Sequence, residues 1–241
     1  MAKEPLLKAL TGAGIGSRRK MADLIREGRV EVNGGVVTGF NYPVDTARDE
    51  VVVDGRRVSL QAEKTVYLIL NKPVGVLSTA RDERGRRTVL DIIPDKYRRM
   101  RLYPVGRLDR DSTGLLLLTN DGELTYQLTH PKFEQEKEYL VRIEGRLRPE
   151  EKRKLERGIE LDEGRAHPAL VKEVMDAPPF TYSITIHEGK KRQIRRMFAS
   201  LGYRVLELKR VRMGNLVLGE LKEGKVRELG AQELHRLKVG K

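Results

Sequence analysis

Cysteine and tryptophan are absent from this chain of 241 residues, and histidine occurs only four times. Without cysteine, the chain has no disulfide framework, no thiolate zinc site and no cysteine nucleophile. The histidines are His130, His167, His187 and His235, and no two of them have the i, i+4 spacing of a helical metal site. We therefore expect no metal site and no need for an oxidising compartment.

Long apolar segments are also missing. Apolar runs are short, such as Leu115–Leu118, whereas a membrane span needs about 20 residues. The first sixteen residues lack the apolar centre of a signal peptide. These absences predict a protein without membrane association that is located in the cytoplasm.

Positive charge is abundant, because 48 Lys and Arg residues stand against 35 Asp and Glu, a net charge of +13. It is unevenly spread: residues 1–60 carry +2, residues 81–110 carry +5 and residues 186–212 carry +7. Clustered positive charge favours a polyanionic partner such as nucleic acid, because binding then releases counterions. The hydrophobic share of 39% is still enough for a packed core at this length.

The first sixty residues predict two helices followed by short strands. A glycine-rich turn at residues 12–16 ends the first helix, and Ser17 is suited to cap a second helix that runs to Glu27. Arg18, Arg19 and Arg26 share one flank of this second helix, where a phosphate-contacting strip and a solvated face are equally open interpretations. Strands are expected at residues 30–32, 36–37, 50–53 and 57–60, with Asn-Gly and Asp-Gly turns between them.

A short polar segment at residues 61–65 marks the expected domain boundary, with domains at 1–62 and 63–241. Strands and helices mix in the second domain without a regular βαβ period, so we expect an α+β fold with a mixed, largely antiparallel sheet flanked by helices. Its strands are expected at 66–70, 115–119, 139–143, 181–187 and 205–208, and its helices at 123–129, 149–157 and 192–201.

A polar loop rich in Arg and Asp, residues 106–114, leads directly into the apolar run 115–118. Asp109 therefore lies at the mouth of a strand that should be buried on both faces. Partial burial makes a carboxylate a stronger nucleophile or base, and it also demands a nearby cation. From the residues alone, Asp109 is either a catalytic carboxylate or a structural turn residue. Asp111 is expected to be structural.

The predicted helix at 192–201 offers the cation that Asp109 needs. Arg195 lies at the border of the helix's apolar stripe and can turn inward to a carboxylate, whereas Arg192 points outward. Lys190 and Lys191 come directly before this helix and favour contact with an anion. Tyr139, in the middle of a predicted strand, has two open interpretations: half-buried packing or a platform for base stacking.

Four segments resemble those of a known enzyme family. Residues 106–122 are similar to the catalytic signature of ribosomal RNA pseudouridine synthases of the RsuA type. Residues 70–75 resemble the first motif of that family, and residues 188–197 resemble the third. Residues 16–34 resemble part of an S4 RNA-binding domain. These segments are spread over residues 16–197 in the order expected of the family.

The resemblance implies roles for single residues. Asp109 would be the nucleophile, with Arg195 as its salt-bridge partner. Arg107 would help to open the RNA and fill the space of the flipped base, and Tyr139 would stack on the target uracil. Contacts with RNA are expected from Arg18, Arg19, Arg26, Lys72, Lys190, Lys191 and Arg192.

The implied reaction isomerises one uridine of ribosomal RNA. The arginine-rich start of the S4 segment and residues 189–197 resemble the members of the family that act on 23S rRNA more than the enzyme that acts on 16S rRNA. It exchanges no electrons and releases no group, so no cofactor or metal is expected. The expected partner is ribosomal RNA or a ribosome assembly intermediate, and the protein is expected to be a monomer. Two alternatives come from other classes: an rRNA-binding assembly factor without chemistry, and an S4-linked RNA methyltransferase.

Overall fold

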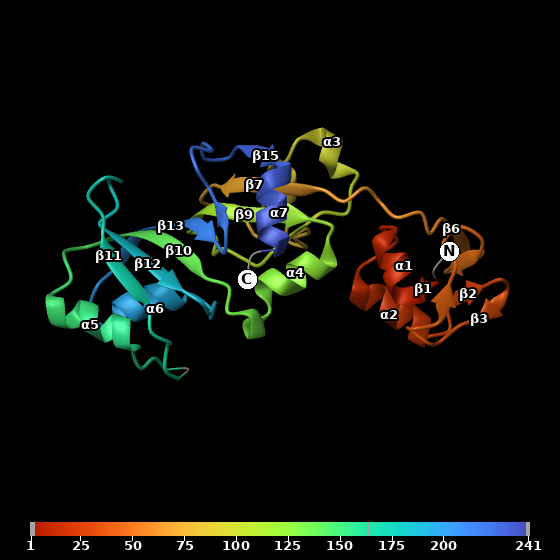
Figure 1. Cartoon of the computed structure of the whole chain (residues 1–241), viewed down its shortest axis with the longest axis horizontal. Helices are drawn as coiled ribbons and strands as arrows, with labels where there is room; N and C mark the ends of the chain where they lie inside the picture. Colours follow the sequence, from red (N-terminus) through yellow and green to blue (C-terminus); the bar gives the residue numbers. More distant parts are fainter. Residues whose placement is uncertain (1–2, 163, 240–241) are drawn as a thin grey trace. The chain divides into compact units, whose positions relative to one another are not determined.

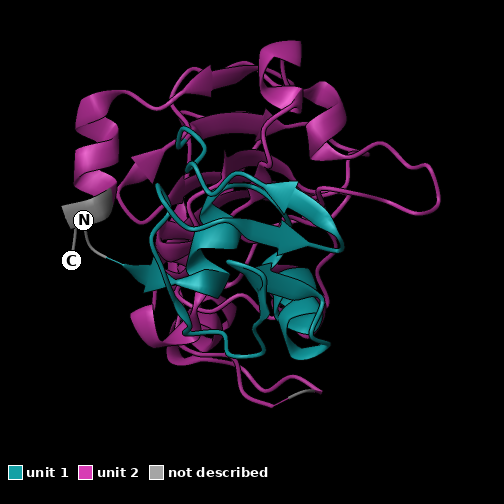
Figure 2. Ribbon diagram, turned by 90° about the vertical axis from the view of Figure 1, so that its right-hand side faces the viewer, with its two compact units in different colours: residues 1–65 teal, residues 66–241 magenta. Residues whose placement is uncertain are grey.

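The computed structural model of the chain describes residues 3–162 and 164–239 (Figure 1). The chain divides into two compact units, residues 1–65 and 66–241, which Figure 2 colours separately. The division falls at the end of the polar segment 61–65, within three residues of the predicted limit of the first domain. The outermost residues of both predicted domains lie outside the described residues.

The first unit begins with the two predicted helices, α1 (Leu6–Gly12) and α2 (Arg18–Arg26). The Oγ of Ser17 accepts a hydrogen bond from the backbone N–H of Lys20 at 3.0 Å, so the predicted N-cap is confirmed. The apolar stripe of α2 packs into the core of this unit through Met21, Leu24 and Ile25.

Two small sheets complete the first unit. The larger is antiparallel and contains, in order, β3 (Gly35–Val36), β2 (Val30–Val32), β5 (Val51–Val53) and β6 (Arg56–Val58). Asn33 and Asp54 have positive φ angles at its two turns, as the Asn-Gly and Asp-Gly signals predict. The sequence did not predict the pairing of β1 (Glu4–Pro5) with β4 (Pro43–Val44), which are too short to show any periodicity.

The second unit is built on one sheet of nine strands. Along its main path the order is β11 (Leu170–Glu173), β12 (Tyr182–Ile186), β10 (Lys137–Ile143), β13 (Val205–Met213), β9 (Thr113–Thr119), β7 (Tyr67–Lys72) and β15 (Val226–Glu228). The short strands β14 (Leu216–Val217) and β8 (Tyr103–Pro104) pair with β13 and β9. Among the described strands of this sheet only β13 and β9 pair in parallel, so the predicted α+β fold with a largely antiparallel sheet is confirmed.

Helices cover both faces of this sheet (Figure 1). On one face, α5 (Pro149–Arg157) and α6 (Gln193–Ala199) pack into the larger core, and on the other α4 (Gly122–Thr129) and α7 (Ala231–Val239) pack into the smaller one. Strand β9 is buried between them, because its leucines alternate between the two cores, as the unbroken apolar run predicts. Two short elements, α3 (Asp95–Arg98) and the 3₁₀ helix η1 (Val89–Ile92), add Tyr97 and Val89 to the larger core, whereas the 3₁₀ helix η2 (Pro131–Phe133) has no buried residue.

The parallel contact between β9 and β13 depends on Gly114. This residue pairs with Arg210 and has a φ of +103°. A Cβ atom at position 114 would lie 2.2 Å from the carbonyl oxygen of Arg210, so no other residue fits without movement of the backbone. This close approach brings the polar loop before β9 next to the strand that follows α6.

Candidate active site

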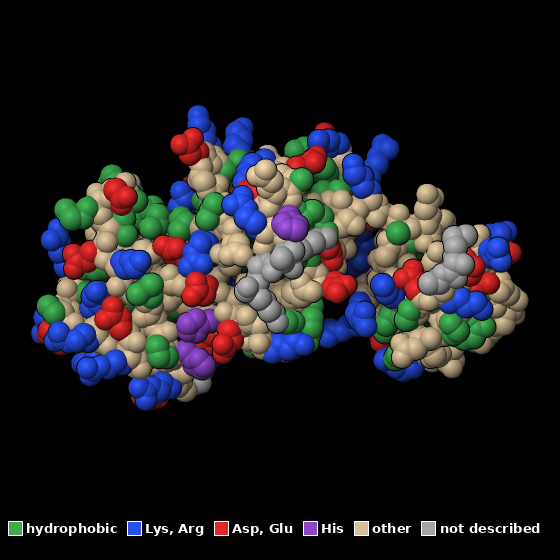
Figure 3. Space-filling model, viewed as in Figure 1, with side chains coloured by type: hydrophobic (Ala, Val, Ile, Leu, Met, Phe, Trp, Pro, Cys, Tyr) green, Lys and Arg blue, Asp and Glu red, His purple; other side chains and the backbone are tan. Residues whose placement is uncertain are grey.

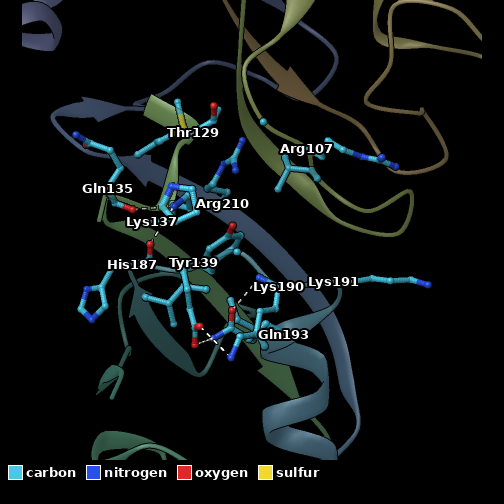
Figure 4. Close-up of a pocket in the computed structure, with 18 of the residues that line it drawn as sticks. Arg107, Thr129, Gln135, Lys137, Tyr139, His187, Lys190, Lys191, Gln193 and Arg210 are labelled. Atoms are coloured by element: carbon cyan, nitrogen blue, oxygen red, sulfur yellow. Dashed lines mark hydrogen bonds and ion pairs between the residues drawn. The ribbon is translucent and has the colours of Figure 1, made fainter. Parts of the chain in front are cut away.

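A cavity of about 1080 Å³ in the second unit is lined by segments that are far apart in the sequence. Arg107 and Asp109 come from the loop before β9, Tyr139 from β10 and Arg210 from β13. Residues 190–193, at the start of α6, complete the wall. Figure 4 shows Tyr139 and Arg210 near the centre of this group, with Arg107 arriving from a separate loop.

The loop that carries Asp109 is held by hydrogen bonds on both sides of that residue. The Oγ of Ser78 donates to the carbonyl oxygen of Leu108 at 2.9 Å and accepts from its backbone N–H at 3.1 Å. The backbone N–H of Gly75 donates to the carbonyl oxygen of Arg110 at 2.8 Å. The segment after β7 therefore fixes the backbone of Asp109 without using its carboxylate.

The carboxylate of Asp109 is half-buried and has no ion pair with any side chain that the structure describes. Three cations nevertheless lie near enough for the charge of Asp109 to act on them: Lys72, Arg192 and Arg195. Burial lowers the pKa values of Lys72 and Arg195, and the charge of Asp109 is among those that oppose this effect. The site thus holds a carboxylate that is near positive charge yet free to contact a substrate.

Lys72 does not occupy the place that we predicted for it. Its side chain is fully buried, and its ammonium group donates to the carbonyl oxygens of Pro73 at 2.7 Å and Ser112 at 2.8 Å. Burial lowers its pKa to about 8. The prediction of a direct RNA contact is therefore wrong, because the register of β7, with Lys72 opposite Gly114, turns the side chain inward under the loop.

Arg195 pairs with Asp111 and not with Asp109. Its Nε lies 3.4 Å from a carboxylate oxygen of Asp111, and one guanidinium nitrogen donates to the carbonyl oxygen of that residue at 2.9 Å. Another donates to the carbonyl oxygen of Val205 at 2.9 Å. The predicted salt bridge is thus absent from this structure, because backbone carbonyls of the loop and of β13 orient the guanidinium toward Asp111.

Asp111 is more than the turn residue that we expected. It accepts two hydrogen bonds from the guanidinium of Arg192, at 3.0 and 3.1 Å, in addition to its contact with Arg195. Burial acts to raise the pKa of Asp111, but the hydrogen bonds from Arg192 and the charge of Arg195 outweigh it and hold the pKa below its ordinary value. Asp111 thereby ties the loop before β9 to the start of α6.

Two basic residues of the cavity were missed by the sequence analysis, Arg210 and Lys137. Arg210 lies opposite Tyr139 in the sheet, is only 2% exposed and donates from Nε to the carbonyl oxygen of Leu115 at 2.8 Å. Lys137 donates to the carbonyl oxygen of Gln135 at 2.8 Å, and burial, followed by the charge of Arg210, lowers its pKa to about 8. Tyr139 itself is 8% exposed and lines the cavity.

The predicted RNA-contacting residues near α6 differ in their freedom. Lys191 is exposed, and Figure 4 shows its side chain extending away from the cavity. Lys190 contacts Glu188 at 3.3 Å and the carbonyl oxygen of Arg165 at 2.9 Å, and Arg192 is held by Asp111. Of these three predicted contacts, Lys191 is the one with no partner among the described residues.

The three arginines of α2 are all exposed, whereas Met21, Leu24 and Ile25 of the same helix are buried. Arg26 donates to Asp23 at 2.8 Å. The i, i+3 spacing brings the two side chains within reach. Arg18 and Arg19 have no partner in the described part of the chain, so their charges are free for an anion.

The surfaces of both units are rich in Lys and Arg on the face drawn in Figure 3, with carboxylates among them. Within residues 3–162 and 164–239, no group of three or more His, Asp or Glu side chains could hold a metal ion. In the same ranges no helix is long and apolar enough to cross a membrane.

Comparison with known proteins matches the two units to two families. Residues 66–200 match the RNA pseudouridylate synthase family, and residues 4–51 match the S4 domain. A solved structure described as a pseudouridylate synthase superposes with a TM-score of 0.68 at 31% identity, covering 97% of this chain and 99% of that one.

Two relatives extend the match over the full length. Ribosomal large subunit pseudouridine synthase B of Bacillus subtilis is 46% identical over 239 residues, which cover 98% of this chain and 96% of that protein. The protein of the same name in Vibrio cholerae is 43% identical over 244 residues, covering 98% and 74%. The chain belongs to the RNA pseudouridylate synthase family and carries an S4 domain before its catalytic unit.

Proposed function

We propose that this enzyme converts one uridine of the large-subunit ribosomal RNA to pseudouridine, with Asp109 as the nucleophile. The observation that carries this proposal is the half-buried carboxylate of Asp109, free of any ion pair with the described side chains, in one cavity with Arg107 and Tyr139. The names of the Bacillus subtilis and Vibrio cholerae relatives support the large subunit as the source of the substrate.

The chemistry matches these groups. The C1′–N1 bond of the uridine breaks, the uracil rotates, and a bond forms between C5 and C1′, while the proton of C5 is lost and N1 gains one. The target must leave its stack to reach the carboxylate, at a cost of a few kcal/mol. Arg107, exposed at the mouth of the cavity, would fill the vacated space, and Tyr139 would stack on the uracil and take part in the proton transfer.

Arg195 is then a positioning residue in the free enzyme. It joins Asp111 to the backbone of Val205, and Asp111 lies two residues from the nucleophile. RNA contacts are assigned to the residues without a described partner, which are Arg18 and Arg19 of α2 and Lys191 beside the cavity. Three further residues would give up their present partners to contact phosphates: Arg26, Lys190 and Arg192. We also propose that the enzyme acts as a monomer in the cytoplasm, which sedimentation and cell fractionation would test.

The substrate is tested by incubating the full chain with transcribed 23S and 16S rRNA and mapping the pseudouridines formed. Modification at one position of 23S rRNA is expected. Isolated ribosome assembly intermediates, used in a parallel reaction, reveal whether folded particles are better substrates than free RNA. Modification of 16S rRNA alone would contradict the choice of subunit, and no modification of any RNA would favour the assembly-factor alternative.

The nucleophile is tested with Asp109→Asn. Turnover should fall at least about a thousandfold, because the covalent step is lost, while RNA affinity should stay within a few-fold of the original enzyme. Asp176→Asn is a matched control, since Asp176 is exposed and does not line the cavity. Substantial turnover by Asp109→Asn would refute the assignment.

A further inference from the structure

Three aromatic rings meet at the surface where α4 passes into η2. The ring of Tyr126 lies 4.7 Å from that of His130 and 5.7 Å from that of Phe133, measured between centroids. The ammonium of Lys132 lies 4.9 Å from the ring centre of Tyr126 and 4.7 Å from that of Phe133. We call these four residues the aromatic corner.

The aromatic corner is not part of the core. Helix α4 packs inward through Leu124 and Leu128, whereas Tyr126 is 46% exposed and His130 and Lys132 are exposed. Aromatic residues make up only 5% of this chain. Among the described exposed large hydrophobic side chains of the second unit, Tyr126 is the only aromatic one. Core packing therefore does not account for this gathering of rings.

Local hydrogen bonds hold the aromatic corner in place. The Nδ1 of His130 accepts from the backbone N–H of Lys132 at 3.2 Å, and the backbone N–H of His130 donates to the carbonyl oxygen of Tyr126 at 3.0 Å. Glu134 then turns the chain with a φ of +45°. The rings are thus ordered before any ligand arrives, which lowers the entropic cost of binding.

The aromatic corner borders the cavity that holds Asp109. Thr129, His130 and Pro131 line that cavity together with Arg107. A Cβ atom added to Gly106 would lie 3.7 Å from the methyl group of Thr129, so the loop before β9 and the end of α4 are in contact. We therefore expect an RNA chain that enters the cavity beside Arg107 to come within reach of this corner.

We propose that the aromatic corner binds an unpaired base of the substrate RNA next to the target uridine. Removing a uridine from its stack deprives the neighbouring base of a stacking partner. The rings of Tyr126 and His130 would replace that partner, because every base has a face that can stack on an aromatic side chain. The ammonium of Lys132 would face the phosphate backbone. This inference rests on the proposed function.

The first test measures pseudouridine formation on transcribed 23S rRNA. Tyr126→Ala should raise KM about tenfold and change kcat less than twofold, because the platform acts in binding. Tyr126→Phe keeps the ring and should recover most of the lost affinity. The matched control is Tyr42→Ala, which removes a tyrosine of similar exposure, 43%, from the first unit. A fall in kcat and in melting temperature without a change in KM would overturn the proposal in favour of a structural role.

The second test detects the contact itself. The full chain is irradiated with 23S rRNA transcribed with 5-iodocytidine, which cross-links to aromatic side chains, and the adduct is mapped by mass spectrometry. We expect an adduct within residues 122–134 that Tyr126→Ala removes. If the enzyme is active but gives no such adduct, and Tyr126→Ala leaves KM unchanged, base binding by the aromatic corner is refuted while the proposed function stands. An adduct without any pseudouridine formation would instead support RNA binding by the aromatic corner and refute the proposed function.

Discussion

At the scale of single residues, Arg195 links the loop of the nucleophile to β13 through Asp111 and Val205. Arg195→Ala should lower the single-turnover rate at saturating RNA about a hundredfold, because a displaced catalytic group costs that much. Arg192→Ala serves for comparison, since it removes the other partner of Asp111 from a more exposed position. It should mainly raise KM. Equal rates for the two variants would show that Arg195 does not position the loop, and a melting curve separates this effect from unfolding.

At the scale of elements, the junction of β9 and β13 tolerates only glycine at position 114. Gly114→Ala has two effects: the alanine is strained at a positive φ, and its Cβ clashes with the backbone of Arg210. Together they should lower the free energy of unfolding by about 2–6 kcal/mol. Gly85→Ala is the control, since Gly85 also has a positive φ but no atom within 4 Å of the added Cβ. It should cost about 1–2 kcal/mol. Denaturant titration measures the unfolding free energy of both variants. Similar losses would show that the close approach of Gly114 to Arg210 contributes little.

At the scale of the whole molecule, the net charge of +13 should appear as a salt dependence of RNA binding. Replacing Arg18 and Arg19 together by alanine should reduce the slope of log K against log salt by about 0.7–0.9 for each lost phosphate contact. Arg26→Ala should change the slope less, because Asp23 already neutralises part of its charge. RNA binding is measured from low to moderate salt. An unchanged slope in the double variant would exclude Arg18 and Arg19 from the interface.

Several regular elements of both units could be predicted from local patterns. The cap at Ser17 and the helix at residues 149–157 follow from signals a few residues long, and the unbroken run at 115–118 indicates a strand buried on both faces. In the second unit, strands β8, β11, β14 and β15 and helices α3 and α7 were not predicted. The four strands and α3 are only two to four residues long, which is too short to show a period. Helix α7 was not recognised from its short apolar pair, Leu234 and Leu237.

The partners of the charged side chains were harder to predict than the elements. Arg195 and Asp111 are 84 residues apart in the chain, and the carbonyl oxygens that orient the guanidinium leave no mark in the sequence. Burial of Lys72 and Arg210 likewise depends on strand register, which places a basic residue inside when backbone carbonyls accept its hydrogen bonds.

The family resemblance, the two-part organisation and the loop that carries Asp109 could be inferred from short segments, because these features follow local physical rules. The ion pairs could not: Asp109 has none among the described side chains, whereas Asp111 pairs with both Arg192 and Arg195. The reason is geometric. An ion pair requires contact within about 4 Å, and that distance is set by how the sheet, the loop and the helix pack together.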